Sequence, residues 1–332
     1  MSGKPVVALA LSKSLHEIMF MSEDLSRLGE LAEVVGPVQE PKSEAIQPLL
    51  REATAAITCW GSPRFDAALL DGAPKLKLIA HSAGSIRPVV TDAVYERGIQ
   101  ITTAAAANAE PVAETTVAMM VIMLKRIPWV FPQRAERRAL LQPVKPIREL
   151  RDLEIGIIGA SRVGREVIRL LQSYPRLRIK VYDPYLTEME ARNLRVERAS
   201  LEDVCRCEVV SVHAPSLEST RHMLNARTLA LLPDHAVLLN TSRGSLIDET
   251  ALVAEVRRRP LYVYLDVTEP EPPAVDSPLL KEPNILLTPH IAGAMNQARK
   301  DMGRLAIDET LRFLRGEPLS QAVTRQMLPS QA

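Results

Sequence analysis

The sequence predicts an α/β protein of two domains, the larger of which contains a doubly wound parallel sheet. Its 332 residues are enough for two domains of ordinary size. In the second half of the chain, six apolar runs each end in a polar or glycine-containing cluster, and stretches of helical periodicity separate most of them. This alternation is typical of a parallel sheet covered by helices. The six runs span residues 154–159, 179–183, 209–215, 236–243, 261–266 and 284–290.

Residues 1–103 repeat the alternation on a smaller scale, with a helical pattern over Leu15–Leu31 after the first candidate strand. A last helix is expected over Met295–Leu314, and we expect it to return to this first unit. The sequence therefore predicts one discontinuous domain, formed by residues 1–103 and 295–332, and a second domain formed by residues 104–294. The candidate strands of the first domain are Val6–Leu11, Ala55–Thr58, Leu76–Ala80 and Ile99–Thr102.

Composition and charge argue against several kinds of partner. With 41 basic and 40 acidic residues, the net charge of +1 gives no reason to expect nucleic acid or an anionic membrane as a partner. Three cysteines, Cys59, Cys205 and Cys207, form neither a disulfide framework nor a zinc-site pattern. The apolar stretch Val112–Leu124 is too short to span a membrane. We therefore expect a cytoplasmic protein with reduced thiols and no metal.

The residues that close the six apolar runs are the first candidates for a functional site. Parallel strands all end at one edge of their sheet, and open α/β sheets bind ligands at that edge. Glycines, a cation, acids and imidazoles gathered there would provide a cofactor site and a reactive centre. The polar residues expected at this edge are Asp183, His213, Arg243, Asp266 and His290.

The segment Gly159-Ala-Ser-Arg-Val-Gly164 has the context of a dinucleotide-binding turn, because it follows a strand and opens an amphipathic helix. The helix start would present backbone N–H groups to a pyrophosphate. Ser161 occupies a position where glycine is usual; its Cβ crowds the approach, but its hydroxyl could donate to phosphate. Asp183 ends the next strand, where an acid can hold the ribose 2′-OH and repel a 2′-phosphate, which favours NAD over NADP. Alternatively, Asp183-Pro184 forms only a turn.

Three ionisable residues near the ends of late strands match the needs of 2-keto acid reduction. Arg243 offers a bidentate fork for a carboxylate, His290 can donate a proton near neutral pH, and Glu271 favours the imidazolium form. Taken singly, the arginine could cap a strand, the histidine could be a core residue and the glutamate could lie in a plain loop. Their joint occurrence favours a catalytic constellation.

Over nearly its whole length the chain resembles the D-isomer-specific 2-hydroxyacid dehydrogenase family. The resemblance implies a Rossmann-type nucleotide domain and a smaller flavodoxin-like α/β substrate domain. It also implies that the arginine binds the substrate carboxylate, that the histidine is the acid/base and that Glu271, in preference to Glu269, supports the histidine. The blocks that carry it are Asn108–Glu114, Gly156–Gly164, Tyr182–Pro184, Val212–Pro215, Asn240–Gly244, Leu265–Val267, Glu271-Pro272 and Thr288–Ile291.

The resemblance also implies contacts with the cofactor and the substrate. Asp266 matches the aspartate that holds the nicotinamide carboxamide, and His213 matches a residue beside the cofactor. The expected cofactor contacts are Gly159, Ser161, Arg162, Val163, Asp183, His213, Ala214, Pro215, Thr241, Ser242, Arg243, Asp266, His290 and Gly293.

Backbone amides of a loop in the first domain are expected to bind the substrate carboxylate, and the matching residues are Ser82, Ala83, Gly84 and Ser85. Family members usually have a second glycine and an Asp-Asn pair there, whereas this chain continues Ser85-Ile-Arg-Pro88. Arg87 could reach an extra anionic group on the substrate, although we favour a surface position. His81 is either a packing residue or part of the site.

The leading hypothesis is an NAD(H)-dependent enzyme that interconverts a small 2-keto acid and a D-2-hydroxy acid. Glyoxylate, hydroxypyruvate and larger keto acids all remain open as substrates. An NAD-binding scaffold of the corepressor type is the alternative, and oxidation of formate or phosphite is a second rival. We expect a homodimer, with Val112–Leu124 and the proline-rich residues 127–150 as interface parts.

Overall fold

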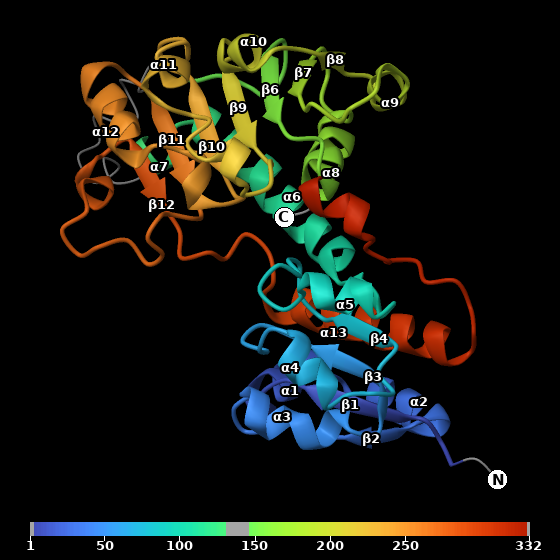
Figure 1. Ribbon diagram of the computed structural model, residues 1–332. Coiled ribbons are helices and arrows are strands. Elements are labelled where there is room, and N and C mark those ends of the chain that lie inside the picture. The colour runs from blue at the N-terminus through green and yellow to red at the C-terminus, as the bar shows by residue number, and fades with distance from the viewer. Residues whose placement is uncertain (1–2, 131–145, 331–332) are drawn as a thin grey trace. The chain divides into compact units, whose positions relative to one another are not determined.

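The computed structural model describes residues 3–130 and 146–330 (Figure 1). The chain divides into two compact units: unit 1 is Met1–Asn108 with Ala294–Ala332, and unit 2 is Ala109–Gly293. These boundaries lie a few residues from those expected at 103/104 and 294/295, while the assignment of substrate and cofactor roles to the two domains stays a prediction. Of the segment 127–150 predicted as an interface part, residues 131–145 lie outside the described residues.

Unit 1 contains a five-stranded parallel sheet in the order β2-β1-β3-β4-β5. This 2-1-3-4-5 order is that of flavodoxin-like folds. The four predicted strands are present, and β2 is an additional short edge strand. The strands are β1 (Val6–Ala10), β2 (Glu33–Val35), β3 (Ala53–Thr58), β4 (Leu78–His81) and β5 (Gln100–Thr103).

Helices cover both faces of this sheet (Figure 1). Alternate strand residues enter two separate cores, one with α1, α2 and α13 and the other with α3, α4 and α5. The single helix expected over Leu15–Leu31 is wrong, because Phe20 and Met21 adopt extended backbone and separate two helices. The helices of unit 1 are α1 (Lys13–Met19), α2 (Ser22–Leu31), α3 (Ser43–Leu50), α4 (Ala67–Asp71), α5 (Asp92–Glu96), α13 (Asn296–Leu314) and the 3₁₀ helix η6 (Arg325–Ser330).

Unit 2 contains a seven-stranded parallel sheet in the order β12-β11-β10-β9-β6-β7-β8. From β6 the chain adds strands in one direction as far as β8 and then returns to add β9–β12 on the other side, which is the doubly wound order of Rossmann folds. All six predicted runs contain a strand, and β8 is an additional two-residue edge strand. The strands are β6 (Glu154–Ile158), β7 (Arg178–Tyr182), β8 (Glu197–Arg198), β9 (Val209–Val212), β10 (Val237–Asn240), β11 (Tyr262–Leu265) and β12 (Ile285–Leu287).

Two buried cores lie on the two faces of the unit 2 sheet, one shared with α6, α8 and α9 and the other with α10, α11 and α12. No helix in the described part of the chain is both long and apolar enough to cross a membrane. The remaining helices are α6 (Ala105–Leu124), α7 (Ile127–Val130), α8 (Arg162–Leu171), α9 (Glu188–Leu194), α10 (Leu201–Cys205), α11 (Ala226–Leu229), α12 (Glu249–Arg258), and the 3₁₀ helices η3 (Glu218–Thr220), η4 (Gly244–Leu246) and η5 (Pro278–Lys281).

Candidate active site

The predicted dinucleotide turn joins β6 to α8 at the point where the strand order reverses. Gly159 has φ of +97°, and a Cβ on it would lie 2.6 Å from the backbone nitrogen of Ala214. A Cβ on Gly164 would lie 2.1 Å from the carbonyl oxygen of Gly159. Both positions therefore require glycine. The close packing of the turn brings the backbone N–H groups at the start of α8 to the carboxyl edge, where they can bind a phosphate group. The turn fits the dinucleotide that the motif predicts.

Ser161 and Arg162 equip this turn for an anion. The Ser161 hydroxyl oxygen caps α8 by accepting a hydrogen bond from the Gly164 N–H at 3.3 Å, so its own O–H can still donate. Arg162 lies in the first helical turn and, among the described residues, has no ion-pair partner within 4 Å. Val163 packs against the unit 2 core. The helix start thus combines free N–H groups with a hydroxyl and a cation.

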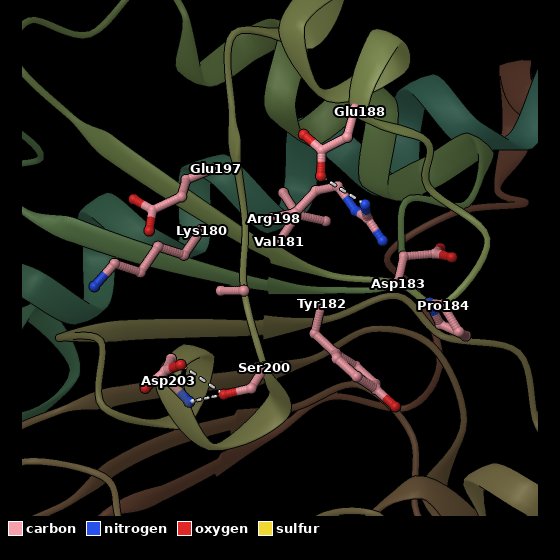
Figure 2. Close-up of a pocket in the computed structure, with 11 residues that line it drawn as sticks. Lys180, Val181, Tyr182, Asp183, Pro184, Glu188, Glu197, Arg198, Ser200 and Asp203 are labelled. Carbon is pink, nitrogen blue, oxygen red and sulfur yellow. Dashed lines mark hydrogen bonds and ion pairs between the residues drawn. The ribbon is translucent and has the colours of Figure 1, made fainter.

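Asp183 lies at the carboxyl end of β7, beside the turn. Its Oδ2 accepts a hydrogen bond from the Ala160 N–H at 2.7 Å, and its Oδ1 accepts one from the Tyr185 N–H at 2.8 Å. The carboxylate is therefore fixed next to the glycine turn, where each oxygen keeps a lone pair for a ribose hydroxyl. Asp183 also lines a pocket of about 470 Å³ at the edge of the sheet (Figure 2).

Arg243 follows β10 in a loop that Asn240 organises. The Asn240 side chain donates to the carbonyl of Arg243 at 2.8 Å and accepts from the Ser242 N–H at 3.0 Å. A Cβ on Gly244 would lie 2.1 Å from the carbonyl carbon of Thr268, so the glycine lets this loop meet the segment that leads to Glu271. The sequence did not identify Asn240 as a site residue. Its position as the last residue of a buried strand was the available signal.

The loop that carries His290 is held by Asp266, which is buried. The Asp266 carboxylate accepts hydrogen bonds from the Ile291 and Ala292 N–H groups at 2.9 Å each and from the Thr288 hydroxyl at 2.5 Å. The N–H of His290 donates to the backbone carbonyl of Asp266 at 2.9 Å, and His290 has a left-handed φ of +53°. Asp266 thus orients the histidine, a role that the sequence did not indicate for it or for Thr288.

His290 and Glu271 form a direct pair. His290 Nδ1 lies 2.6 Å from Glu271 Oε1, and both side chains are nearly half exposed. The competing Glu269 instead accepts a hydrogen bond from Arg221 at 2.9 Å, which lowers the pKa of the Glu269 carboxyl. The structure therefore pairs the second of the two glutamates with the predicted acid/base.

Arg243 is half-buried in the same region of unit 2. Burial lowers the pKa of its guanidinium, and the negative charge of Glu271 partly opposes this shift. The guanidinium nevertheless stays charged at neutral pH, because arginine side chains keep their proton there. One Nη1 donor is used by the carbonyl of Ser242 at 2.7 Å. The remaining N–H donors of Arg243 can bind an anion, and the attraction is strong because the guanidinium is partly removed from water.

The other predicted cofactor contacts of unit 2 lie around the same edge. The Ser242 hydroxyl donates to the Ala214 carbonyl at 2.8 Å, and the Thr220 hydroxyl donates to the Pro215 carbonyl at 2.6 Å. Thr241 shares a hydrogen bond with Thr116 of α6 at 3.0 Å. These bonds tie the loops after β9 and β10 to their neighbours. Gly293 is the last residue of unit 2.

His213 has a different environment from His290. Its side chain is buried, its Nε2 shares a hydrogen bond with Ser211 at 2.9 Å, and burial lowers its pKa to about 3. It therefore stays neutral at physiological pH. Its Cβ would lie 3.4 Å from a Cβ placed on Gly164, so it packs beneath the glycine turn. A buried neutral imidazole in this position suits structural support better than proton transfer.

In unit 1, the loop expected to bind the substrate carboxylate follows β4. The N–H and the hydroxyl of Ser82 both donate to the Thr58 carbonyl at 2.8 Å, so Ser82 has no donor left for a ligand. The N–H groups of Ala83, Gly84 and Ser85 have no acceptor among the described residues. Three free amides in one loop can bind an anion.

The sequence allows two roles each for His81 and Arg87, which lie near this loop, and the structure shows the surroundings of both side chains. His81 shares a hydrogen bond with Thr58 at 2.9 Å, and burial lowers its pKa to about 4, so it is a neutral packing residue. Arg87 is exposed and donates to the Leu328 carbonyl at 2.5 Å. That position agrees with the surface role we favoured for it.

Comparisons with known proteins agree on one family. Residues 117–292 match the profile of the D-isomer specific 2-hydroxyacid dehydrogenase, NAD binding domain. The chain is 30% identical over 304 residues to a glyoxylate reductase of Aeropyrum pernix, covering 89% of this chain and 90% of the relative. It is 28% identical over 329 residues to a D-3-phosphoglycerate dehydrogenase of Methanocaldococcus jannaschii, covering 98% of this chain and 61% of the relative.

A solved structure of Rhodotorula graminis D-mandelate dehydrogenase has a TM-score of 0.85 at 23% identity, over 97% of this chain and 98% of that chain, and shows a shared fold. The chain spans only about three fifths of the phosphoglycerate dehydrogenase. The profile match, however, covers more than half of the chain. The predicted resemblance is thus confirmed: the chain belongs to the D-isomer specific 2-hydroxyacid dehydrogenase family and contains its NAD-binding domain.

Proposed function

We propose that the protein is an NAD(H)-dependent oxidoreductase that interconverts a small 2-keto acid and the corresponding D-2-hydroxy acid. The observation that carries this proposal is the 2.6 Å contact between His290 and Glu271, with the half-buried Arg243 within electrostatic reach of the same glutamate. A proton donor, its supporting acid and a carboxylate-binding cation are the three groups that the reaction needs.

The pairing assigns a role to each nitrogen of His290. Nδ1 lies against the Glu271 carboxylate, which as an ion can only accept, so Nδ1 carries a proton and the ring orientation is fixed. Nε2 is then the nitrogen that gives a proton to the carbonyl oxygen in reduction and removes it in oxidation. Arg243 binds the substrate carboxylate and draws electron density from the neighbouring carbonyl. Glu271 stabilises the charged imidazole before the proton moves.

In the reduction, NADH would supply, when bound, the hydride that becomes the hydrogen on C2. His290 supplies the proton for the oxygen, so the C=O double bond becomes a C–OH group with no other reactant. Gly159, Ser161 and Arg162 would hold the pyrophosphate, and Asp183 would hold the adenosine ribose. The carboxylate of Asp183 supports a preference for NAD(H), since it repels a 2′-phosphate.

A panel of 2-keto acids tests the proposal. Glyoxylate, hydroxypyruvate and longer 2-keto acids are each mixed with NADH and the wild-type protein, and NADH consumption is followed by absorbance. At least one substrate should be turned over, and Arg243→Ala should raise its KM and lower kcat, because the cation acts in binding and in catalysis. Absence of turnover over the whole panel would contradict the proposal.

The rival activities have less support. Both relatives named above, and the structural neighbour, are named as enzymes, so nothing in them favours the corepressor-type scaffold. Formate dehydrogenases of related architecture pair histidine with glutamine, whereas His290 here contacts a glutamate. A hydroxy acid is therefore a better substrate class than formate.

We further propose a homodimer that works in the cytoplasm. The basis is the family resemblance together with α6, a long apolar helix on which Met119, Val121 and Ile122 stay only partly buried. Light scattering on the purified protein should give twice the mass of one chain. A monomeric mass would contradict the dimer.

A further inference from the structure

An ion pair stands beside the residue proposed to hold the adenosine ribose. The Arg198 guanidinium of β8 donates to the Glu188 carboxylate, at the first position of α9, with an Nη1–Oε1 distance of 2.7 Å. Both residues line the pocket that Asp183 lines, and Figure 2 shows the Arg198 side chain directed toward the carboxyl edge where Asp183 lies. The pocket therefore contains a cation that could meet a phosphate.

The sheet register explains why Arg198 lies so near the ribose position. β8 pairs in parallel with β7, and Arg198 is the register partner of Val181, two residues before Asp183. A long arginine side chain on the neighbouring strand can span the distance to the strand end. Arg198 is 39% exposed and Glu188 is 69% exposed, so neither group is locked by burial. Exposed ion pairs of this kind contribute little to stability.

We propose that Glu188 determines cofactor choice by neutralising Arg198. This inference rests on the proposed function, since it assumes that a dinucleotide occupies the turn. With the pair intact, the Glu188 carboxylate neutralises the Arg198 guanidinium, and the carboxylate of Asp183, which lines the same pocket, repels a 2′-phosphate. Without the Glu188 charge, the Arg198 guanidinium fork is free to bind the phosphate in bidentate fashion.

The test measures binding and not turnover. NADH and NADPH are titrated separately into the purified protein by isothermal calorimetry, and the ratio of the two Kd values is compared between variants. Glu188→Gln should lower the ratio of the NADPH Kd to the NADH Kd about fivefold, a modest effect because the pair is exposed and screened by solvent. Glu188→Gln combined with Arg198→Gln should remove the whole gain, because the phosphate partner is then absent.

Glu197→Gln is the matched control. Glu197 lines the same pocket and loses the same charge on substitution, but the hydrogen bond between Arg198 and Glu188 stays intact. Its ratio should equal that of the wild type. An unchanged ratio of the NADPH Kd to the NADH Kd in Glu188→Gln, or an equal fall of this ratio in Glu197→Gln, would overturn the inference. In either case, NADH binding by the wild type would leave the proposed function unaffected. A wild type that binds neither dinucleotide would refute both.

Discussion

The two units contain similar parallel sheets, but the carboxyl edges of these sheets carry different chemical groups. At the carboxyl edge of unit 1, the groups free to bind an anion are backbone amides after β4, and the adjacent His81 is buried and neutral. At the edge of unit 2, Arg243, Glu271 and His290 are charged or titratable and partly exposed. Two similar parallel sheets can therefore present different chemical groups at their carboxyl edges, because the residue types that follow the strands differ.

The largest effect is expected from a substitution in the proposed catalytic residues of unit 2. His290→Gln removes the proposed proton donor and should lower kcat about a thousandfold in the NADH assay. His222→Gln is the matched control, because His222 also lies beside a glutamate, at 3.8 Å from Glu269, but does not contact the predicted machinery. Its activity should stay within about twofold of the wild type. Equal losses in both variants would remove the distinction between the two histidines.

The next largest effect concerns how tightly the two edges are packed. Gly244→Ala in unit 2 puts a Cβ against the Thr268 backbone and should lower the free energy of unfolding by about 2–3 kcal/mol, measured by urea denaturation. Gly84→Ala in unit 1 points into open space and should change it by less than about 0.5 kcal/mol. A larger loss from Gly84→Ala would show that we have misjudged which edge is close-packed.

Much of this contrast could be predicted from the sequence. The apolar runs located six strands of unit 2, and the residues ending them, from Gly159 to His290, lie at one edge because parallel strands end together. The choice of Glu271 over Glu269 rested on family blocks alone, and the structure now pairs Glu271 with His290 and Glu269 with Arg221.

Other parts of the site could not be predicted, because they depend on three-dimensional contacts between distant segments. The hydrogen bonds of Asp266 to Ile291 and Ala292 join residues 25 and 26 positions apart. Burial, which makes His81 and His213 neutral, is equally invisible in the spacing of residues. The short strands β2 and β8 were not predicted, because segments of three and two residues are too short to show an alternation of apolar and polar residues.

The two buried histidines give each unit its own acid sensitivity. Their pKa values fall to about 4 for His81 and about 3 for His213, whereas in the unfolded chain both bind protons below about pH 6.5. The unfolded state then holds more protons, so the free energy of unfolding decreases as the pH falls from 6.5, by about 1.4 kcal/mol per pH unit for each histidine. His81 ceases to contribute to this decrease near pH 4, and His213 ceases to contribute near pH 3.

Urea unfolding across about pH 4 to about pH 6.5 measures these slopes. His213→Gln and His81→Gln should each reduce the slope of the free energy of unfolding against pH, by similar amounts. A wild-type slope retained in either variant would show that the substituted histidine is protonated in the folded protein.

A smaller effect should distinguish the proposed cofactor contact of Asp183 from a purely structural role. Asp183→Ala removes the proposed ribose acceptor and should weaken NADH about tenfold, as measured by calorimetric titration. The affinity for NADPH should fall less, because the same carboxylate repels the 2′-phosphate of NADPH. Equal losses for both dinucleotides would mean that Asp183 only supports the glycine turn through its bonds to Ala160 and Tyr185.

The most direct test of the account compares the two glutamates that lie two positions apart. Once a keto-acid substrate is found, kcat is measured for Glu271→Gln and Glu269→Gln with NADH in excess. The account predicts that Glu271→Gln lowers kcat about a hundredfold, since the imidazole loses its supporting charge, whereas Glu269→Gln stays close to the wild type. An equal effect of both substitutions, or a larger one from Glu269→Gln, would contradict it.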